Sequence, residues 1–120
     1  MKLVLKSKQD YGTHSDEFTE EFDCSVSEEN NNIKINFENG SILIEENKIT
    51  HERGNNKMVI EPGKVHGCDY ETENGMIVLD IKGLNVEKFS NELKTIAKAK
   101  YQIIIVGIEP YINEIEIMVI

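Results

Sequence analysis

Several polar side chains suited to binding a small molecule share a strand face with apolar residues. Residues two apart in a β-strand point to the same side of the sheet, so a polar residue in phase with apolar ones points toward the interior. A guanidinium binds a carboxylate through two parallel hydrogen bonds, and hydroxyl and imidazole groups add further donors. We therefore predict an interior ligand site made of Arg53, His66, Tyr70, Thr72, Tyr101 and Glu20.

Two interpretations of these residues remain open. In the first, Arg53 pairs with the carboxylate of a small amphipathic acid, and the protein binds this ligand without catalysis. In the second, the interior is filled: Arg53 and Glu20 form an internal ion pair, and Tyr70 and Tyr101 cap the core with their hydroxyls. Arg53 is the one arginine beside twelve lysines. Its planar fork of donors favours a specific role, although a lone surface arginine is the simpler reading.

Patterns for metal binding or catalysis are weak. His66 and Cys68 lie in phase, and Cys24 or His51 would have to complete a metal site, but Cys-x-x-Cys and His-Glu-x-x-His spacings are absent. A cysteine beside His66 would be the nucleophile of a hydrolase, yet proximity on a strand does not activate a thiolate. We predict no metal, no cofactor and no enzymatic activity.

The charge balance argues against nucleic-acid binding. The chain holds 22 acidic and 13 basic residues, a net charge of −9, whereas phosphate contacts need clustered lysine or arginine. Residues 9–33 contain eight acids and neither lysine nor arginine. This acidic segment, or a sheet edge, gives the alternative function, a protein-interaction or structural module. The other reading is a charged strand that keeps an edge from pairing with other chains.

The sequence also bears on location and partners. No apolar run approaches the roughly 18 residues of a membrane span, and residues 1–6 are too short for a signal peptide. Two cysteines are too few for a secreted disulfide framework, so we expect reduced thiols. We predict a cytoplasmic protein, monomer or homodimer, with a possible small-molecule ligand and neither nucleic acid nor membrane as a partner.

Short alternating strands dominate the pattern. Isoleucine occurs 17 times and alanine twice, which favours β-structure because branched side chains suit a pleated surface. Asn39-Gly40 predicts a hairpin turn, and Asn30 to Asn32 predict another turn. Expected strands cover about residues 2–8, 17–26, 33–37, 42–44, 48–53, 57–60, 65–72, 76–82, 103–106 and 115–119.

Residues 85–100 admit either a helix or two strands. Val86, Phe89 and Leu93 repeat at helical spacing behind Asn85 as a cap. Alternatively, Ser90-Asn91 forms a turn, and a long strand places Ala97, Ala99, Tyr101, Ile103 and Ile105 on one face. Periodicity does not separate these two alternatives.

The strand count predicts the architecture. The 120 residues fit one domain, residues 1–120, with a core of its own. About eight to ten short antiparallel strands imply a barrel or a sandwich. We favour a single up-and-down barrel, because closure removes the long exposed edges of an open sheet.

The second half of the chain carries a pattern of short motifs. These are Arg53-Gly54, Met58, Tyr70-Glu71-Thr72-Glu73-Asn74-Gly75, Tyr101-Gln102-Ile103, Gly107 and a last strand from Asn113. In them the chain resembles the YwiB-like family of small bacterial proteins of unknown function. The resemblance implies a lipocalin-like (calycin-like) β-barrel, with strands across residues 85–100. It implies no activity.

Overall fold

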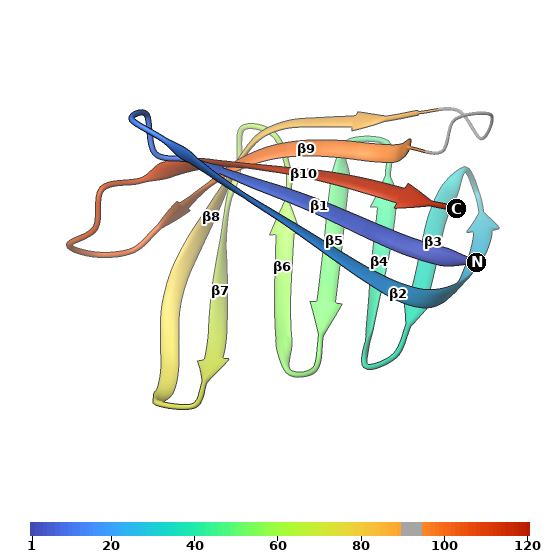
Figure 1. The fold of residues 1–120 in the computed structure, drawn as a ribbon, viewed down its shortest axis with the longest axis horizontal. Coiled ribbons are helices and arrows are strands. Elements are labelled where there is room, and N and C mark those ends of the chain that lie inside the picture. Colours follow the sequence, from blue (N-terminus) through green and yellow to red (C-terminus); the bar gives the residue numbers. More distant parts are fainter. Residues whose placement is uncertain (90–94) are drawn as a thin grey trace.

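The part of the protein that the structure describes is built from ten β-strands. The computed structural model describes residues 1–89 and 95–120 (Figure 1). The secondary-structure elements within these residues are all β-strands. The strands are β1 (Lys2–Asp10), β2 (Ser15–Glu29), β3 (Asn32–Phe37), β4 (Gly40–Glu45), β5 (Lys48–Arg53), β6 (Asn56–Ile60), β7 (Val65–Thr72), β8 (Gly75–Lys88), β9 (Thr95–Ile104) and β10 (Tyr111–Val119). The predicted all-β fold is confirmed. In the described residues no helix is long and apolar enough to cross a membrane.

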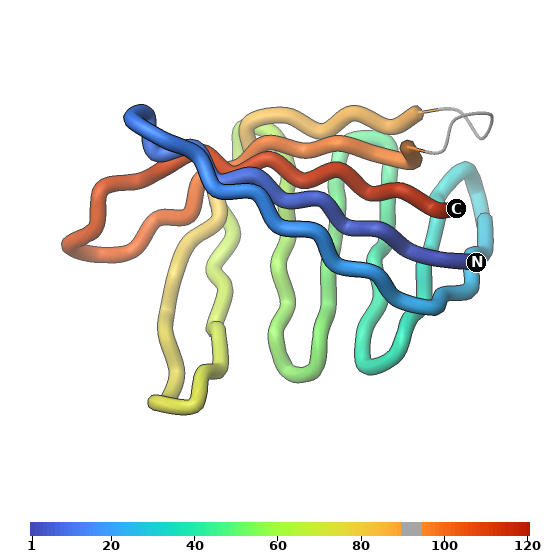
Figure 2. The backbone as a smooth tube through the Cα atoms, in the orientation of Figure 1, coloured from blue at the N-terminus to red at the C-terminus, as the bar shows by residue number. Residues whose placement is uncertain are grey.

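The strands form one nearly closed antiparallel sheet. Their order is β6-β5-β4-β3-β2-β1-β10-β9-β8-β7, so consecutive strands other than β6 and β7 are neighbours, and the first strand pairs with the last. The chain ends lie side by side in Figure 2, where the Lys2 and Ile120 backbones exchange hydrogen bonds of 2.7 and 2.9 Å. Only β6 and β7, which end the strand order, have no backbone ladder between them. This is the predicted up-and-down barrel, with a seam between β6 and β7.

Two long strands turn the sheet into two layers. β2 pairs with β1 through Ser15–Asp23 and with β3 through Cys24–Glu29. β8 pairs with β7 through its first half and with β9 through its second half. In Figure 1, β1, β9 and β10 run across the picture, whereas β3 to β7 run roughly at right angles to them. Each long strand therefore carries the sheet around a corner of the barrel.

Gly83 lies inside β8, where the sequence predicted the end of a strand. The pairing of β8 with β9 shifts register between Gly83 and Asn85, which marks a β-bulge. A Cβ atom at Gly83 would lie 2.2 Å from the Glu61 carbonyl oxygen. The Gly83 backbone also exchanges hydrogen bonds of 3.0 Å with Gly63 and Lys64. Glycine is required at position 83 because the backbone of Glu61 passes directly beside it. The strand β8 continues beyond Gly83.

The choice between helix and strands for residues 85–100 is settled in favour of strands wherever the structure describes them. β8 continues to Lys88, and β9 begins at Thr95. Val86 pairs with Ala99, and both side chains are buried. The predicted Ser90-Asn91 turn lies outside the described residues. The resemblance to YwiB-like proteins implied strands in this region. The helical spacing of its apolar residues did not.

The Asn39-Gly40 hairpin is confirmed, but its turn lies one residue earlier than predicted. Phe37 pairs with Gly40, so Glu38 and Asn39 form the two-residue loop, and Asn39 has a φ of 64°. A Cβ atom at Gly40 would lie 2.6 Å from both the Phe37 ring and the Glu52 carbonyl oxygen. Gly40 thus serves close packing within β4. The predicted turn at Asn30 and Asn31 is also present, with φ values of 54° and 67°.

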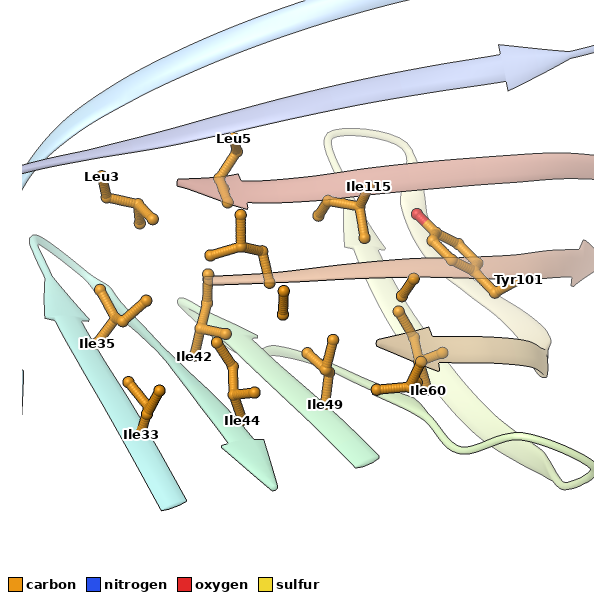
Figure 3. Packing of buried hydrophobic residues seen from close by; sticks show 14 of the residues in the cluster. Leu3, Leu5, Ile33, Ile35, Ile42, Ile44, Ile49, Ile60, Tyr101 and Ile115 are labelled. Atoms are coloured by element: carbon orange, nitrogen blue, oxygen red, sulfur yellow. The ribbon is translucent and has the colours of Figure 1, made fainter. Parts of the chain in front are cut away.

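Isoleucines fill one end of the barrel. Figure 3 shows side chains from β3, β4 and β5 packing against those from β1 and β10 on the opposite layer. The small side chains of Ala97 and Ala99 bring β9 close to this cluster. Tyr101 lies at the edge of the packed region in Figure 3. The largest fully buried side chains are Leu3, Ile35, Ile42, Ile44, Ile49, Ile60, Ile81 and Ile117.

Candidate functional site

A cavity occupies the other end of the barrel interior. Its volume is about 470 Å³, within the roughly 300–1,000 Å³ typical of small-molecule sites. Strands of both layers contribute to it. Its walls are formed by Leu5, Ser7, Gln9, Phe18, Glu20, His51, Arg53, Asn56, Lys57, Met58, Cys68, Tyr70, Leu79, Ile81, Tyr101, Ile103, Ile105, Tyr111, Asn113 and Ile115.

The cavity is apolar at depth and charged at its mouth. Leu5, Ile81 and Ile115 are buried lining residues, whereas Phe18 and Tyr70 are about half exposed. The charged lining residues are Glu20, Arg53 and Lys57, and all three are exposed. An amphipathic molecule fits this division, with its apolar part inside and its polar end at the opening.

Arg53 and Glu20 form an ion pair at the mouth. Arg53 Nη2 donates to Glu20 Oε2 at 2.8 Å, and Nη1 donates to Oε1 at 3.4 Å. The guanidinium carbon also lies 4.9 Å from the centre of the Phe22 ring. The two side chains are 44% and 47% exposed, so the pair is not internal to the core. Two of the five donors of Arg53 are used, and the others have no hydrogen-bond partner among the described residues, so they can bind another acceptor.

His51 lies beside this pair, on the same face of β5 as Arg53. Burial lowers the pKa of its imidazole, and the positive charge of Arg53 lowers it further, against a smaller opposite effect of Glu20. The ring is therefore neutral at pH 7. Its Nε2 atom is buried and has no hydrogen-bond partner in the described part of the chain. A neutral imidazole nitrogen either donates or accepts a hydrogen bond, depending on its tautomer.

Asn113 and Tyr101 bring polar groups to the inner wall. They are paired neighbours on β10 and β9. Asn113 is 3% exposed, and its Nδ2 atom has no hydrogen-bond partner within residues 1–89 and 95–120. Burial raises the pKa of Tyr101 to about 12, with a further contribution from Tyr111. The Tyr101 phenol is therefore protonated at pH 7 and keeps its capacity to donate.

Four of the six predicted site residues border the cavity, namely Glu20, Arg53, Tyr70 and Tyr101. His66 faces a smaller hollow of about 400 Å³ between β6 and β7. Its Nε2 atom lies 3.0 Å from Glu61 Oε1. Thr72 closes the β7–β8 turn, where its hydroxyl donates to the Gly75 carbonyl at 2.8 Å and accepts from the Asn74 N–H at 3.2 Å. The structure does not bring His66 and Thr72 to the cavity.

The thiols are not arranged as activated nucleophiles. Burial raises the pKa of Cys68, with a smaller contribution from Asp69, and burial also raises that of Cys24. Both are free cysteines, and a raised pKa keeps the less reactive thiol form. Within the described residues no group of three or more His, Cys, Asp or Glu side chains is placed to hold a metal ion.

A second hollow, of about 560 Å³, lies on the outer face of the sheet. Lysines on one strand lie opposite glutamates on the next, with Lys100 Nζ 3.2 Å from Glu114 and Lys98 Nζ 3.7 Å from Glu116. These charges neutralise one another across strands, which stabilises a solvated sheet face. The interior cavity is therefore the better candidate for a ligand site.

Sequence reasoning missed Asn113 and left His51 outside the predicted site. Asn113 is in phase with Ile115 and Ile117, which are buried on the same strand. The rule that selected Glu20 and Tyr101, a polar residue in an apolar row, therefore also selects Asn113. Lys57 gave no such indication, because its neighbours two residues away are Asn55 and Val59.

Comparison with known structures identifies the fold of the chain. No protein-family model matches the chain, and no curated protein matches it in sequence. A crystal structure of the YwiB protein from Bacillus subtilis is similar, with a TM-score of 0.70 and 11% sequence identity. The match covers 98% of this chain and 89% of that one. The protein thus has a YwiB-like β-barrel fold.

Proposed function

We propose that the protein binds a small amphipathic acid in the interior cavity, without catalysis. The apolar part of the ligand lies against Leu5, Ile81 and Ile115, and its carboxylate lies at the mouth beside Arg53. The observation that carries this proposal is the cavity itself, with buried apolar walls and one charged rim.

The charges at the rim favour an anionic head group. Arg53 uses two of its five donors on Glu20 at the rim, whereas the Lys57 ammonium lies 3.9 Å from Glu52, which is not part of the cavity wall. A carboxylate accepts hydrogen bonds from the donors of Arg53 that Glu20 leaves free. A cationic head group would lie beside the Arg53 guanidinium, which repels it.

Titration calorimetry with decanoate and decylamine tests the proposal. The two molecules have the same apolar chain and opposite charges, so we expect the acid to bind and the amine to bind at least about tenfold more weakly, a difference of about 1.4 kcal/mol. Native mass spectrometry of protein purified gently from its own host should show a retained acid. Equal affinities, or no binding of decanoate, would contradict the proposal.

Arg53→Met is the matching variant. It keeps an unbranched side chain at the rim and removes the charge, so decanoate binding should weaken by about 10- to 100-fold, the range for a hydrogen bond to a charged group. Lys34→Met is the control, because it removes one positive charge from the exposed outer face of β3. An equal loss in both variants would mean that general charge, and not the site, attracts the acid.

One observation favours a second candidate, a protein-interaction module. The first half of β2 pairs with β1 through Ser15–Asp23, whereas pairing with β3 begins only at Cys24. One backbone edge of this acidic half is thus free for another chain. Analytical ultracentrifugation combined with affinity capture distinguishes the candidates: a strict monomer without a stoichiometric partner speaks against the module.

A further inference from the structure

We propose that the acid bound in the cavity is a hydroxy acid, whose hydroxyl binds Asn113 inside the barrel. This inference rests on the proposed function and adds a second recognition point. Asn113 is the one buried polar residue among residues 1–89 and 95–120. It borders the cavity, and none of these residues supplies a hydrogen-bond partner to its Nδ2 atom.

The neighbours of Asn113 do not satisfy it. On one side it pairs with Gln9 of β1, whose side-chain oxygen accepts the Tyr11 hydroxyl at 2.7 Å. On the other side it pairs with Tyr101 of β9. Ile115, the next residue on this face of β10, offers no polar side chain. The unmet donor therefore borders a space that a ligand can enter.

A hydroxyl group on the ligand matches the unpaired polar atoms of the cavity better than a second charged group does. Asn113 Nδ2 requires an acceptor, and His51 Nε2 requires either an acceptor or a donor. A hydroxyl group both accepts and donates, so it suits either atom. A second carboxylate would place an uncompensated charge against buried apolar walls, which is unfavourable.

The size of the cavity suits such a ligand. At the roughly 30 Å³ that a water molecule occupies in the liquid, 470 Å³ corresponds to about fifteen waters. An acid with on the order of ten carbons fits this space and reaches inward from the rim. A water beside Asn113 in the free protein would be displaced by a hydroxyl that reproduces its hydrogen bond, whereas a methylene cannot reproduce it.

Calorimetry with decanoate and a series of monohydroxydecanoates tests the inference. The hydroxyl is moved along the chain from one member of the series to the next, so one member places it at Asn113. We expect that member to bind about five- to tenfold more tightly than decanoate, the effect of one neutral hydrogen bond. In Asn113→Leu, which has a similar shape and no donor, this preference should disappear while decanoate still binds.

Controls separate the inference from the function on which it rests. Asn36→Leu, on the exposed face of β3, should keep the preference, and Asn113→Ala repeats the test if the leucine variant does not fold. Decanoate binding without a preferred hydroxylated member overturns the hydroxy-acid inference and leaves the acid-binding function standing. A preference that persists in both Asn113 variants overturns it as well. Binding of no member of the series overturns both.

Discussion

At the scale of single residues, Glu20 and a ligand carboxylate would compete for the hydrogen-bond donors of Arg53 at the mouth of the cavity. The carboxylate of Glu20 already occupies two donors of Arg53, at 2.8 and 3.4 Å. It stands where a ligand carboxylate would bind most strongly. The Arg53–Glu20 pair of the second sequence interpretation therefore forms, but at the exposed rim and not inside a filled core, and Arg53 also borders the open cavity.

Glu20→Gln should strengthen acid binding. The substitution removes the competing charge and frees the Arg53 fork for the ligand, so we expect decanoate to bind about tenfold more tightly, close to the value of one charged hydrogen bond. Stability should change by less than about 1 kcal/mol, because pairs this exposed contribute little. Calorimetry and urea denaturation measure the two effects.

The matched control is Glu17→Gln, which removes the same charge from the outer face of the same strand. An identical gain in both variants would show that net charge alone controls affinity. A loss of affinity in Glu20→Gln would show that Glu20 helps to hold the ligand and does not compete with it.

His51 should make the protein less stable as the pH falls below neutrality. Its pKa is lowered in the folded state, first by burial and then by Arg53. The unfolded chain therefore takes up the proton first, near pH 6.5. Stability from this group is complete above about pH 7 and is lost as the pH falls through 6.5 toward the folded pKa.

Urea denaturation between pH 7.5 and 5.5 measures this effect. His51→Gln should flatten the dependence of stability on pH in this range. The substitution removes the imidazole that is harder to protonate in the folded protein than in the unfolded chain. Carboxylates with lowered pKa values, such as Glu61 and Asp23, lose their contribution only as the pH falls through about 4. The same substitution at His14, in the exposed loop between β1 and β2, is the control. Profiles that coincide for wild type and His51→Gln would exclude His51 as the cause.

At the scale of elements, strands and turns could be predicted more completely than strand ends. Alternating residues such as Ile33, Ile35 and Phe37 identify a half-buried strand from local sequence alone. The role of Gly83 depends on Glu61, a residue 22 positions earlier whose backbone passes beside it. That contact is tertiary, so local sequence marks a glycine but does not distinguish a strand end from a bulge.

Gly83→Ala should therefore destabilise the protein strongly. The added Cβ atom would lie 2.2 Å from the Glu61 carbonyl oxygen, so the backbone of one segment must move. We expect a loss of at least about 2 kcal/mol in the free energy of unfolding, as for other substitutions that overpack a buried contact. Urea denaturation gives the value.

Gly67→Ala provides the comparison on the neighbouring strand. Its nearest neighbour would be an Asp80 side-chain oxygen at 3.8 Å, an ordinary contact. Alanine also restricts the unfolded chain, so this variant should be neutral or slightly stabilised. Equal losses in the two variants would mean that the crossing of residues 61–64 over Gly83 does not constrain the fold.

At the scale of the whole molecule, the barrel is packed at one end and hollow at the other. Strand rhythm predicts a barrel, but it does not predict how far side chains fill it. The difference arises from volume: isoleucines from β3, β4 and β5 meet Leu3 and Ile117 at the packed end. At the other end, Ser7, Cys68 and Asn113 are among the side chains facing the interior. Side-chain contacts between distant strands depend on the pairing register of the strands, which a single sequence does not reveal.

The seam between β6 and β7 is the weakest closure of the barrel. Side chains hold one end of it: Asn56 Oδ1 accepts the Glu71 N–H at 2.9 Å, and Asn55 Nδ2 donates to Glu71 Oε2 at 3.0 Å. Near the other end, Pro62 bridges to Gly83. Cys68 and Lys57 border both the cavity and the hollow beside the seam. Opening of the seam would therefore give the cavity a second connection with solvent, beside its mouth.

Hydrogen exchange should locate this opening. Amides of β6 and β7 should exchange faster than those of the fully paired β3 and β4, because each seam strand has one edge without a ladder. Asn56→Ala removes the acceptor of the Glu71 amide and should speed exchange across β7, whereas Asn36→Ala, on the exposed face of β3, should not. If β7 kept its wild-type protection in Asn56→Ala, the side-chain contacts would not be what closes the seam, and packing between the two layers would have to hold the barrel shut instead.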